Sequence, residues 1–272
     1  MVVQIQLAQI PSEDGVVASN LIRILKLIQD ADEQTDLIVF PETCLMGFPS
    51  QDQVRQIAEP ENGPTITAVL DAVKQKGISV AVGFAEAHDG HFYNTTVLLS
   101  PDGIILKYRK THLWSSDVGV FEPGKELVTA IWKGIRVGIL ICFDIEFPEN
   151  ARALAAQGAE LLIVTNANMD PFGPVHRSLV IARALENQIF AVMANRCGSG
   201  GGLTFAGESV VVSPAGNIVA AMGREEGSQV AKIDFAEVAQ SRTDYNYLKL
   251  RRIPLASGAV VSSGETTRQK IL

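Results

Sequence analysis

Short runs of β-branched and other apolar residues alternate with helical patterns from one end of this chain to the other. Val2–Ala8, Asp36–Phe40 and Ile78–Phe84 have the composition of strands, whereas Gly15–Ala31 and Thr65–Gln75 have apolar residues at helical spacing. A regular alternation of these two patterns is typical of α/β proteins, in which helices cover a sheet. We therefore expect an α/β fold.

The second part of the chain has a similar order of elements. Strands are expected over Val137–Ile141, Glu160–Thr165 and Ile189–Ala194, and helices over Glu149–Gln157 and Val175–Asn187. The similarity suggests two pseudo-equivalent halves that share one core. Because no Pro- or Ser-rich linker separates the halves, we predict a single domain.

Two hairpins and a distinct tail complete this description. The turns Pro101–Gly103 and Pro214–Asn217 join pairs of short strands, because Pro and Gly supply the dihedral angles that a tight turn needs. The single domain is predicted to span residues 1–253. Residues 254–272 are rich in Gly, Ser and small apolar residues, and are expected to be disordered or to cross to a partner subunit.

Composition argues against several classes of protein. The chain has 30 acidic and 23 basic residues and no Lys/Arg-rich run, so we expect no nucleic-acid partner. Its apolar runs are shorter than the roughly 20 residues of a membrane span, so we expect no membrane partner. Three widely spaced cysteines favour a reducing compartment, and we predict a cytoplasmic protein. Without CxxC or HxxxH patterns, we expect no metal and no other cofactor.

Three chemically active residues follow predicted strands. Glu42 comes after the run LIVF and Pro41, Lys110 follows the hairpin strand IILKYR, and Cys142 follows the run VGILI. Ligand sites of α/β sheets gather beyond the carboxyl ends of strands, where loops converge on one crevice. We therefore expect these three side chains to meet.

A carboxylate, an ammonium and a thiol complement one another in nucleophilic catalysis. Glu42 can accept the proton of the Cys142 thiol, and Lys110 can stabilise negative charge on the thiolate or on a carbonyl oxygen under attack. The backbone N–H of Phe143 is the natural second donor to that oxyanion. Taken alone, a cysteine at a strand end is more often a small buried apolar residue.

The segments around the three residues are more specific than the residues themselves. LIVFPE, KYRKTHL and GILICFDIEFPENAR, in this order, resemble the three signature segments of the nitrilase superfamily of carbon–nitrogen hydrolases, and the similarity covers nearly the whole chain. The resemblance implies a four-layer αββα sandwich that forms a homodimer or a higher homo-oligomer. It also implies a Glu42–Lys110–Cys142 triad, a thioester intermediate and release of ammonia from a small amide.

One position departs from the family pattern. Many members carry a second glutamate four residues before the aromatic residue that is Phe121 here, and this chain has Asp117 there. Asp117 is thus a candidate second carboxylate near Lys110, with Glu122 as the other candidate and surface exposure as the alternative.

Substrate preference is inferred from residues near the strand ends. Branches of the family that bind substrate carboxylates often have an arginine three or four residues after the cysteine, where this chain has Ile145 and Glu146. An anionic residue would repel a carboxylate, so we expect a neutral or amine-bearing aliphatic amide, as in the branch containing 5-aminopentanamidases. The other interpretation of Glu146 is that it caps the next helix or pairs with an arginine.

The loop that follows the strand Glu160–Thr165 supplies further candidates for the binding pocket. Asn166 and Met169 are expected to line the pocket, and Asp170 is a possible partner for a substrate amine. The other interpretation is that these residues only form a turn.

Alternatives to an amidase remain open at this level. Hydrolysis of an N-carbamoyl amine or of a nitrile would use the same triad. A catalytically inactive scaffold of the same fold is an alternative of a different class, although all three triad residues are present.

Overall fold

The computed structural model describes residues 1–254 and 258–271, and it contains two large sheets that pack face to face. The six-stranded sheet has the order β14-β1-β2-β3-β4-β5, and the eight-stranded sheet has the order β13-β12-β9-β8-β7-β6-β16-β15. A two-stranded ribbon, β10-β11, lies apart from both. The expected α/β class is confirmed.

Most of the six-stranded sheet comes from the first part of the chain. Its central strands β1, β2 and β3 are parallel, and β4, β5 and β14 are added antiparallel. Its strands are β1 (Val2–Gln9), β2 (Leu37–Val39), β3 (Ser79–His88), β4 (His91–Ser100), β5 (Gly103–Arg109) and β14 (Gly227–Asp234).

The eight-stranded sheet is built from the second part of the chain in a similar way. Its centre is the parallel trio β7, β8 and β9. Its strands are β6 (Glu126–Trp132), β7 (Ile135–Ile141), β8 (Leu161–Asn166), β9 (Phe190–Asn195), β12 (Val210–Val212), β13 (Ile218–Ala221), β15 (Val260–Ser263) and β16 (Thr266–Lys270), and the separate ribbon is β10 (Cys197–Gly200) and β11 (Leu203–Ala206).

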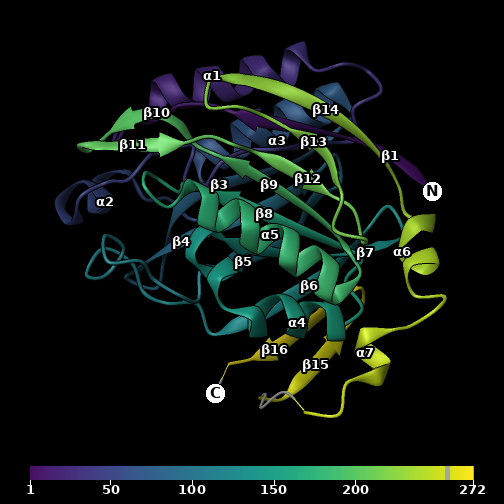
Figure 1. Cartoon of the computed structure of the whole chain (residues 1–272). Helices are drawn as coiled ribbons and strands as arrows, with labels where there is room; N and C mark the ends of the chain where they lie inside the picture. Colours follow the sequence, from purple (N-terminus) through teal and green to yellow (C-terminus); the bar gives the residue numbers. More distant parts are fainter. Residues whose placement is uncertain (255–257, 272) are drawn as a thin grey trace.

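Helices cover the outer faces of the two sheets, which gives four layers (Figure 1). One pair covers the six-stranded sheet and another covers the eight-stranded sheet, so the layer order is αββα, as the sequence predicts. The helices are α1 (Val17–Asp30), α2 (Gln51–Ile57), α3 (Pro64–Lys76), α4 (Pro148–Ala156), α5 (Gly173–Asn187), α6 (Ala236–Ser241) and α7 (Tyr247–Leu250), with a 3₁₀ turn at Cys142–Glu146.

The β2 segment shows why its sequence is apolar without interruption. Leu37 and Val39 pack in the core between the sheets, whereas Ile38 and Phe40 pack under α1 and α3. Successive side chains of a strand point to opposite faces, and both faces of β2 are covered. All four side chains are fully buried, and each contributes about 1.5–3 kcal/mol relative to exposure.

The sequence patterns located the central strands of both sheets and the longer helices, and missed other elements. Among the missed ones are α2, β6, the ribbon β10-β11 and β14. β14 alternates exposed and buried residues, and its pairing with β1 joins residues more than 200 positions apart, which no local pattern reveals.

The tail contributes two strands to the larger sheet. β15 and β16 form a hairpin, and β16 pairs antiparallel with β6 of the same chain. Residues 255–257 and 272 of the predicted tail lie outside the described residues. The predicted domain boundary and the crossing to a partner subunit remain predictions.

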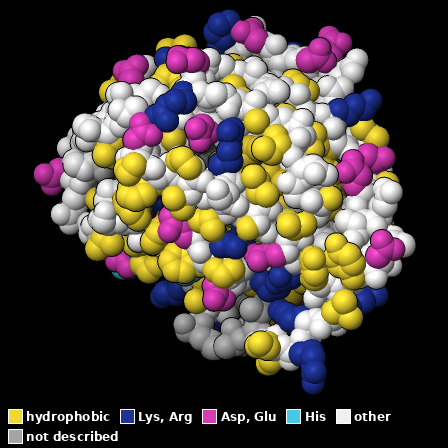
Figure 2. Space-filling view, viewed as in Figure 1, with side chains coloured by type: hydrophobic (Ala, Val, Ile, Leu, Met, Phe, Trp, Pro, Cys, Tyr) yellow, Lys and Arg dark blue, Asp and Glu magenta, His cyan; other side chains and the backbone are white. Residues whose placement is uncertain are grey.

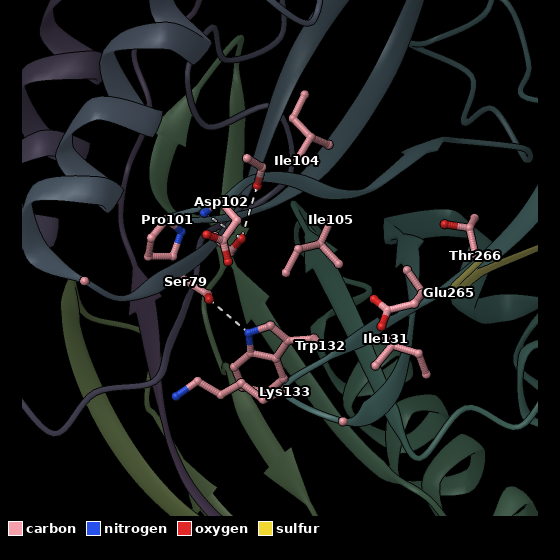
Figure 3. Close-up of a pocket in the computed structure, with 15 residues that line it drawn as sticks. Ser79, Pro101, Asp102, Ile104, Ile105, Ile131, Trp132, Lys133, Glu265 and Thr266 are labelled. Atoms are coloured by element: carbon pink, nitrogen blue, oxygen red, sulfur yellow. Dashed lines mark hydrogen bonds between the residues drawn. The ribbon is translucent and has the colours of Figure 1, made fainter. Parts of the chain in front are cut away.

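Figure 3 shows a cavity of about 590 Å³ that lies away from the three strand ends named above. It is lined by residues such as Asp102, Gly103 and Lys133, and next to it the indole of Trp132 donates a hydrogen bond to Ser79 Oγ at 2.9 Å. β5 and β7 start beside this cavity and end beside the candidate triad. The cavity therefore lies at the opposite end of the sandwich from the triad.

No helix in the described part of the chain combines the length and the apolar character needed to cross a bilayer. The surface around α5 mixes hydrophobic and charged side chains (Figure 2).

Candidate active site

The three predicted triad residues follow β2, β5 and β7, at one end of the sandwich. The two sheets are joined at this end by hydrogen bonds. The Glu42 N–H donates to the Asn166 carbonyl at 3.3 Å, and the hydroxyls of Thr96 and Thr165 lie 2.7 Å apart. These contacts cross from the first half of the chain to the second, so the site is built by both halves.

Lys110 lies at the centre of the site. Its Nζ donates to Glu42 Oε1 at 2.7 Å and to Asp117 Oδ2 at 2.6 Å, and all three side chains are about 1% exposed or less. The Asn94 amide also donates to Glu42 Oε1, at 2.8 Å. One ammonium is thus held between two carboxylates, and all three side chains are buried.

The structure distinguishes the two candidates for the second carboxylate by position. Asp117 contacts Lys110, and its Oδ2 also accepts the Trp114 N–H at 3.0 Å. Glu122 is exposed and faces His91. The turn from Trp114 to Phe121 holds Asp117 inward, because the Asp117 carbonyl accepts the Phe121 N–H at 2.9 Å.

The electrostatics of the trio follow from burial and from the excess of carboxylates. Burial raises the pKa of Glu42, the Lys110 charge opposes this shift, and the Asp117 charge adds to it. Burial would lower the pKa of Lys110, but the Glu42 and Asp117 charges raise it well above its ordinary value. Lys110 therefore stays an ammonium, and Glu42 is the group whose proton affinity is increased.

Cys142 is held at the start of the 3₁₀ turn in a strained conformation. Its φ is +46°, a left-handed value that few residues without glycine's freedom adopt, and its side chain is buried. Burial and the Glu42 charge raise the pKa of the Cys142 thiol well above its ordinary value, although the Lys110 charge lowers it. The resting group is a thiol, so attack on a carbonyl requires a base.

The backbone conformation at Glu42 requires β3 to approach closely the turn that carries Glu42. Thr43, the next residue, has φ +42°, and the Leu45 N–H donates to the Gly83 carbonyl at 3.2 Å. A Cβ on Gly83 would lie 2.4 Å from the Thr43 nitrogen, which is far inside contact distance. Only glycine lets β3 pass this close to the turn that carries Glu42.

Two buried side chains fix the segment after Cys142. Asp144 accepts hydrogen bonds from the Tyr108 hydroxyl at 2.8 Å and from the Ile141 N–H at 3.1 Å. Arg183 on α5 donates to the carbonyls of Ile145 and Glu146 at 3.0 and 3.1 Å. These bonds hold the turn of which Phe143, the candidate oxyanion donor, is the second residue.

A cavity of about 460 Å³ opens onto the trio. Glu42, Lys110 and Asp117 line one part of it. Its other walls come from four loops and are largely apolar, and they include Phe48, Trp114, Val120, Met169, Leu203 and Phe205. Ring contacts continue behind this wall, because Trp114 meets Phe143 edge to face at 5.0 Å between centroids.

The four predicted substrate-binding residues have different surroundings. Met169 lines the cavity, and Asn166 supplies the carbonyl that accepts the Glu42 N–H. Glu146 is not among the lining residues, and its carboxylate lies 3.1 Å from His176 Nε2. Asp170 forms a half-exposed ion pair with Arg224 at 2.5 Å. The Glu146 carboxylate thus contacts a buried histidine, and neither an arginine nor the start of α4 is its partner in the described residues.

Sequence reasoning missed several residues of the site. Asn94 lies in the first half of β4, before the short strand that the sequence predicts ahead of the turn at Pro101. The pairing of β4 with β3 places Asn94 beside the site, where it binds Glu42. Asp14 and Arg196 come from separate loops and pair at 2.8 Å. Gly200 and Gly201, at the tip of the ribbon β10-β11, also line the cavity. Loop-to-loop contacts of this kind leave no local signal.

No group of three or more His, Cys, Asp or Glu side chains arranged to hold a metal ion occurs among residues 1–254 and 258–271.

Comparison with known proteins gives one family and several relatives. The family model for carbon-nitrogen hydrolases matches residues 4–243. An (R)-stereoselective amidase of Pseudomonas sp. is 52% identical over 254 residues, which is 93% of each chain. The 2-oxoglutaramate amidase of Bacillus subtilis is 31% identical over 84% of this chain and 89% of its own.

Solved structures agree with this result. A double mutant of the amidase from Nesterenkonia sp. AN1, in complex with acrylamide, has a TM-score of 0.83 and 29% identity, and covers 92% of this chain and 94% of its own. Another variant of that amidase shows covalent addition of the acetamide moiety of fluoroacetamide at the active-site cysteine, with a TM-score of 0.79, 29% identity and the same coverage.

Proposed function

This chain belongs to the carbon–nitrogen hydrolase family, and on that basis we propose that it is an amidase that converts a small non-peptide amide into a carboxylic acid and ammonia. The proposal rests on one observation above others. The Lys110 ammonium binds Glu42 at 2.7 Å inside a buried site whose remaining reactive group is the Cys142 thiol. The amidase relatives support the bond type.

In the first half of the proposed reaction, the Cys142 sulfur attacks the amide carbon while Glu42 accepts the thiol proton. The carbonyl oxygen becomes negative and is stabilised by the Lys110 ammonium and the Phe143 N–H. Glu42, now protonated, gives its proton to the amide nitrogen as the carbon–nitrogen bond breaks. Ammonia leaves, and an acyl thioester of Cys142 remains.

In the second half, Glu42 removes a proton from a water molecule, whose oxygen attacks the thioester carbon. The carbon–sulfur bond breaks, the carboxylic acid leaves, and the sulfur recovers the proton from Glu42. Asp117 keeps Lys110 in its charged form throughout, because its carboxylate raises the pKa of that amine. Balanced over both halves, one amide and one water give one acid and one ammonia.

The test is ammonia release from a panel of neutral amides, amino-amides, an ω-amide of a dicarboxylate, carbamoyl amines and a nitrile. Turnover should be highest with neutral or amino-amides and should vanish in Cys142→Ala. Cys197→Ala is the matched control, because Cys197 is also a buried free cysteine, and its thiol contacts the Gln9 carbonyl rather than the triad. An acyl adduct on Cys142 after acid quenching would support the thioester, and full activity in Cys142→Ala would exclude this mechanism.

We also retain two proposals about the whole molecule. Large apolar side chains on α5, on α7 and just after α7 are at least 40% exposed, which favours association with a second copy of the chain: Val175, Leu185, Tyr247, Leu250 and Ile253. Light scattering after size-exclusion chromatography measures this directly. The three free cysteines support a cytoplasmic location, which fractionation of the source cells would test.

A further inference from the structure

Asp14, on the loop between β1 and α1, presents one carboxylate oxygen to the cavity. Its side chain is 21% exposed and lines the cavity. Oδ1 accepts the Phe48 N–H at 2.9 Å and an Arg196 N–H at 2.8 Å. Oδ2 accepts no hydrogen bond from the part of the chain that the structure describes, so it keeps its lone pairs for a ligand.

The ribbon β10-β11 leaves space beside this free oxygen. A Cβ on Gly200 would lie 2.7 Å from Asp14 Oδ2, and one on Gly201 would lie 3.7 Å from it. Both glycines line the same cavity. Side chains at these positions would cover the oxygen, and their absence keeps it accessible.

The cation that neutralises Asp14 is not accessible to a ligand. Arg196 is fully buried, donates to the Ser12 carbonyl at 2.5 Å, and has its guanidinium 3.9 Å from the centre of the Phe205 ring. A ligand in the cavity therefore meets the Asp14 carboxylate and not the guanidinium behind it. Arg196 acts as a positioning residue that fixes the direction of the carboxylate.

The charges that line the cavity are predominantly negative. Three carboxylates, Asp14, Glu42 and Asp117, face it together with a single cation, Lys110, which is already bound between two of them. Such a cavity attracts a cationic group and repels a carboxylate. The aromatic walls add to this preference, because ring faces attract cations.

Two other carboxylates considered for this role have partners elsewhere. Glu146 faces His176 and Asp170 faces Arg224, and neither lines the cavity. Asp14 is the carboxylate that lines the cavity without belonging to the trio around Lys110.

We propose that Asp14 determines specificity by binding, through Oδ2, the protonated amine of a substrate whose acyl part is an apolar body with an amino group. This inference rests on the proposed amidase function and narrows it to amino-amides. The apolar walls hold the body of the substrate, and its amide end lies towards Glu42 and Lys110, which line the cavity.

The test compares amino-amides with isosteres in which a methyl group replaces the ammonium. One pair is 5-aminopentanamide and hexanamide, and another is phenylalaninamide and 2-methyl-3-phenylpropanamide. In wild type, kcat/KM should favour the amine of at least one pair by about tenfold or more, as a partly shielded ion pair of about 1.4 kcal/mol would give. Asp14→Asn should abolish that preference through KM while kcat on the isostere changes little. Asp14→Glu, which keeps the charge, should retain part of it.

Glu146→Gln and Asp170→Asn are the matched controls, because each removes one negative charge close to the site. Neither should change the ratio, and a ratio that disappears in one of them assigns the amine to that residue and overturns the proposal. Raising the pH through the pKa of the substrate's own amine should remove the preference in wild type.

Binding to the Cys142→Ala protein separates this inference from the proposed function. Calorimetry should show tighter binding of the amino-amide than of its isostere, and no difference after Asp14→Asn is added; this readout requires no turnover and excludes variants that have unfolded. Good hydrolysis without an amine preference would refute the role of Asp14 and keep the amidase. Selective, Asp14-dependent binding without any hydrolysis would support the role of Asp14 and refute the amidase function.

Discussion

Two groups of buried charges lie on neighbouring strands and differ in how completely they are paired. Lys110 follows β5 and faces the cavity, whereas Lys107 and Arg109 lie on the other face of β5 and bind Glu86 of β3. We call Glu86, Thr95, Lys107 and Arg109 the Glu86 cluster. It has two partly exposed cations around one buried carboxylate, with the more exposed Glu61 also bound to Lys107, and the candidate site has two carboxylates around one buried cation.

In the Glu86 cluster both carboxylate oxygens are fully used. Oε1 accepts from Lys107 at 2.9 Å and from Arg109 at 2.7 Å, and Oε2 accepts from Arg109 and Thr95 at 2.8 Å each. Burial alone would raise the pKa of Glu86, but these hydrogen bonds lower it to about 2. Glu86 has no reason to accept a proton near neutral pH, and its role is structural.

In the candidate site two oxygens are left without partners. Glu42 Oε2 and Asp117 Oδ1 are buried and accept no hydrogen bond from the described residues. Burial is the main cause of the raised pKa of Glu42. An unpaired oxygen with a raised proton affinity is suited to accepting a proton, so the difference between the clusters separates groups that hold the fold from groups that do chemistry.

The largest effect should come from Glu42→Gln. The amide cannot accept the thiol proton, so kcat/KM should fall by about 10²–10⁴-fold, the usual contribution of a general base. Thermal stability should stay the same or rise, because one of two like charges around Lys110 is removed. Ammonia release and thermal denaturation measure both effects, and activity within tenfold of wild type would show that Glu42 is not the base.

Glu86→Gln should have the opposite pattern. Removing the carboxylate charge leaves Arg109 without its acidic partner, while Lys107 keeps Glu61, and breaking a buried pair of this kind costs up to about 3–5 kcal/mol of unfolding free energy. Activity should stay within a few-fold of wild type at temperatures where the variant is folded. Asp30→Asn, which breaks the exposed Lys26–Asp30 pair, is the control and should change stability by only about 0.5 kcal/mol or less. A large loss of activity without loss of stability would show that Glu86, like Glu42, contributes to catalysis rather than to the fold.

The sequence predicted the buried strands and the three strand-end residues because both are local, whereas the order of the four layers was implied by the family resemblance. A run such as LIVF must be buried on both faces, and the residue after it must emerge at the sheet edge, wherever the strand finally packs. The family resemblance gave Asp117 as the candidate second carboxylate and left Glu122 as the other candidate. Only the turn from Trp114 to Phe121, which directs Asp117 inward, distinguishes them.

The walls of the cavity could not be predicted in this way. Asp14 and Arg196 are 182 positions apart, and each lies in a loop whose composition is ordinary. Their pairing depends on how β1 and β9, which come from different sheets, are positioned relative to each other. The charges that line the cavity thus depend on how the two sheets pack together. The positions of the candidate triad residues depend only on where individual strands end.

Asp117→Asn should give a smaller loss than Glu42→Gln. The Asp117 charge raises the pKa of Glu42, so its removal should lower that pKa and make Glu42 a weaker base. The loss in kcat/KM should be on the order of 10-fold to 100-fold, below the full contribution of the base. The diagnostic result is the pH profile, whose acid limb should move to lower pH. An unmoved limb would show that Asp117 does not act on Glu42 by its charge.

The smallest expected effect is on the pH dependence of the unfolding free energy. Glu86 and Glu42 should change it in opposite directions. The folded-state pKa of Glu86 is about 2, below the ordinary 4.5, so its contribution to stability is complete above pH 4.5 and is lost as the pH falls towards 2. The folded-state pKa of Glu42 is raised above 4.5, so stability is lost as the pH rises from 4.5 through the raised value.

Urea denaturation of wild type, Glu86→Gln and Glu42→Gln across this pH range measures each contribution as a difference. The advantage of wild type over Glu86→Gln should shrink below pH 4.5, and the advantage of Glu42→Gln over wild type should grow above it. Each slope is limited to about 1.4 kcal/mol per pH unit, because one proton is involved. Slopes of the same sign would mean that both carboxylates are stabilised as anions, and the unpaired oxygen of Glu42 would then not mark it as the base.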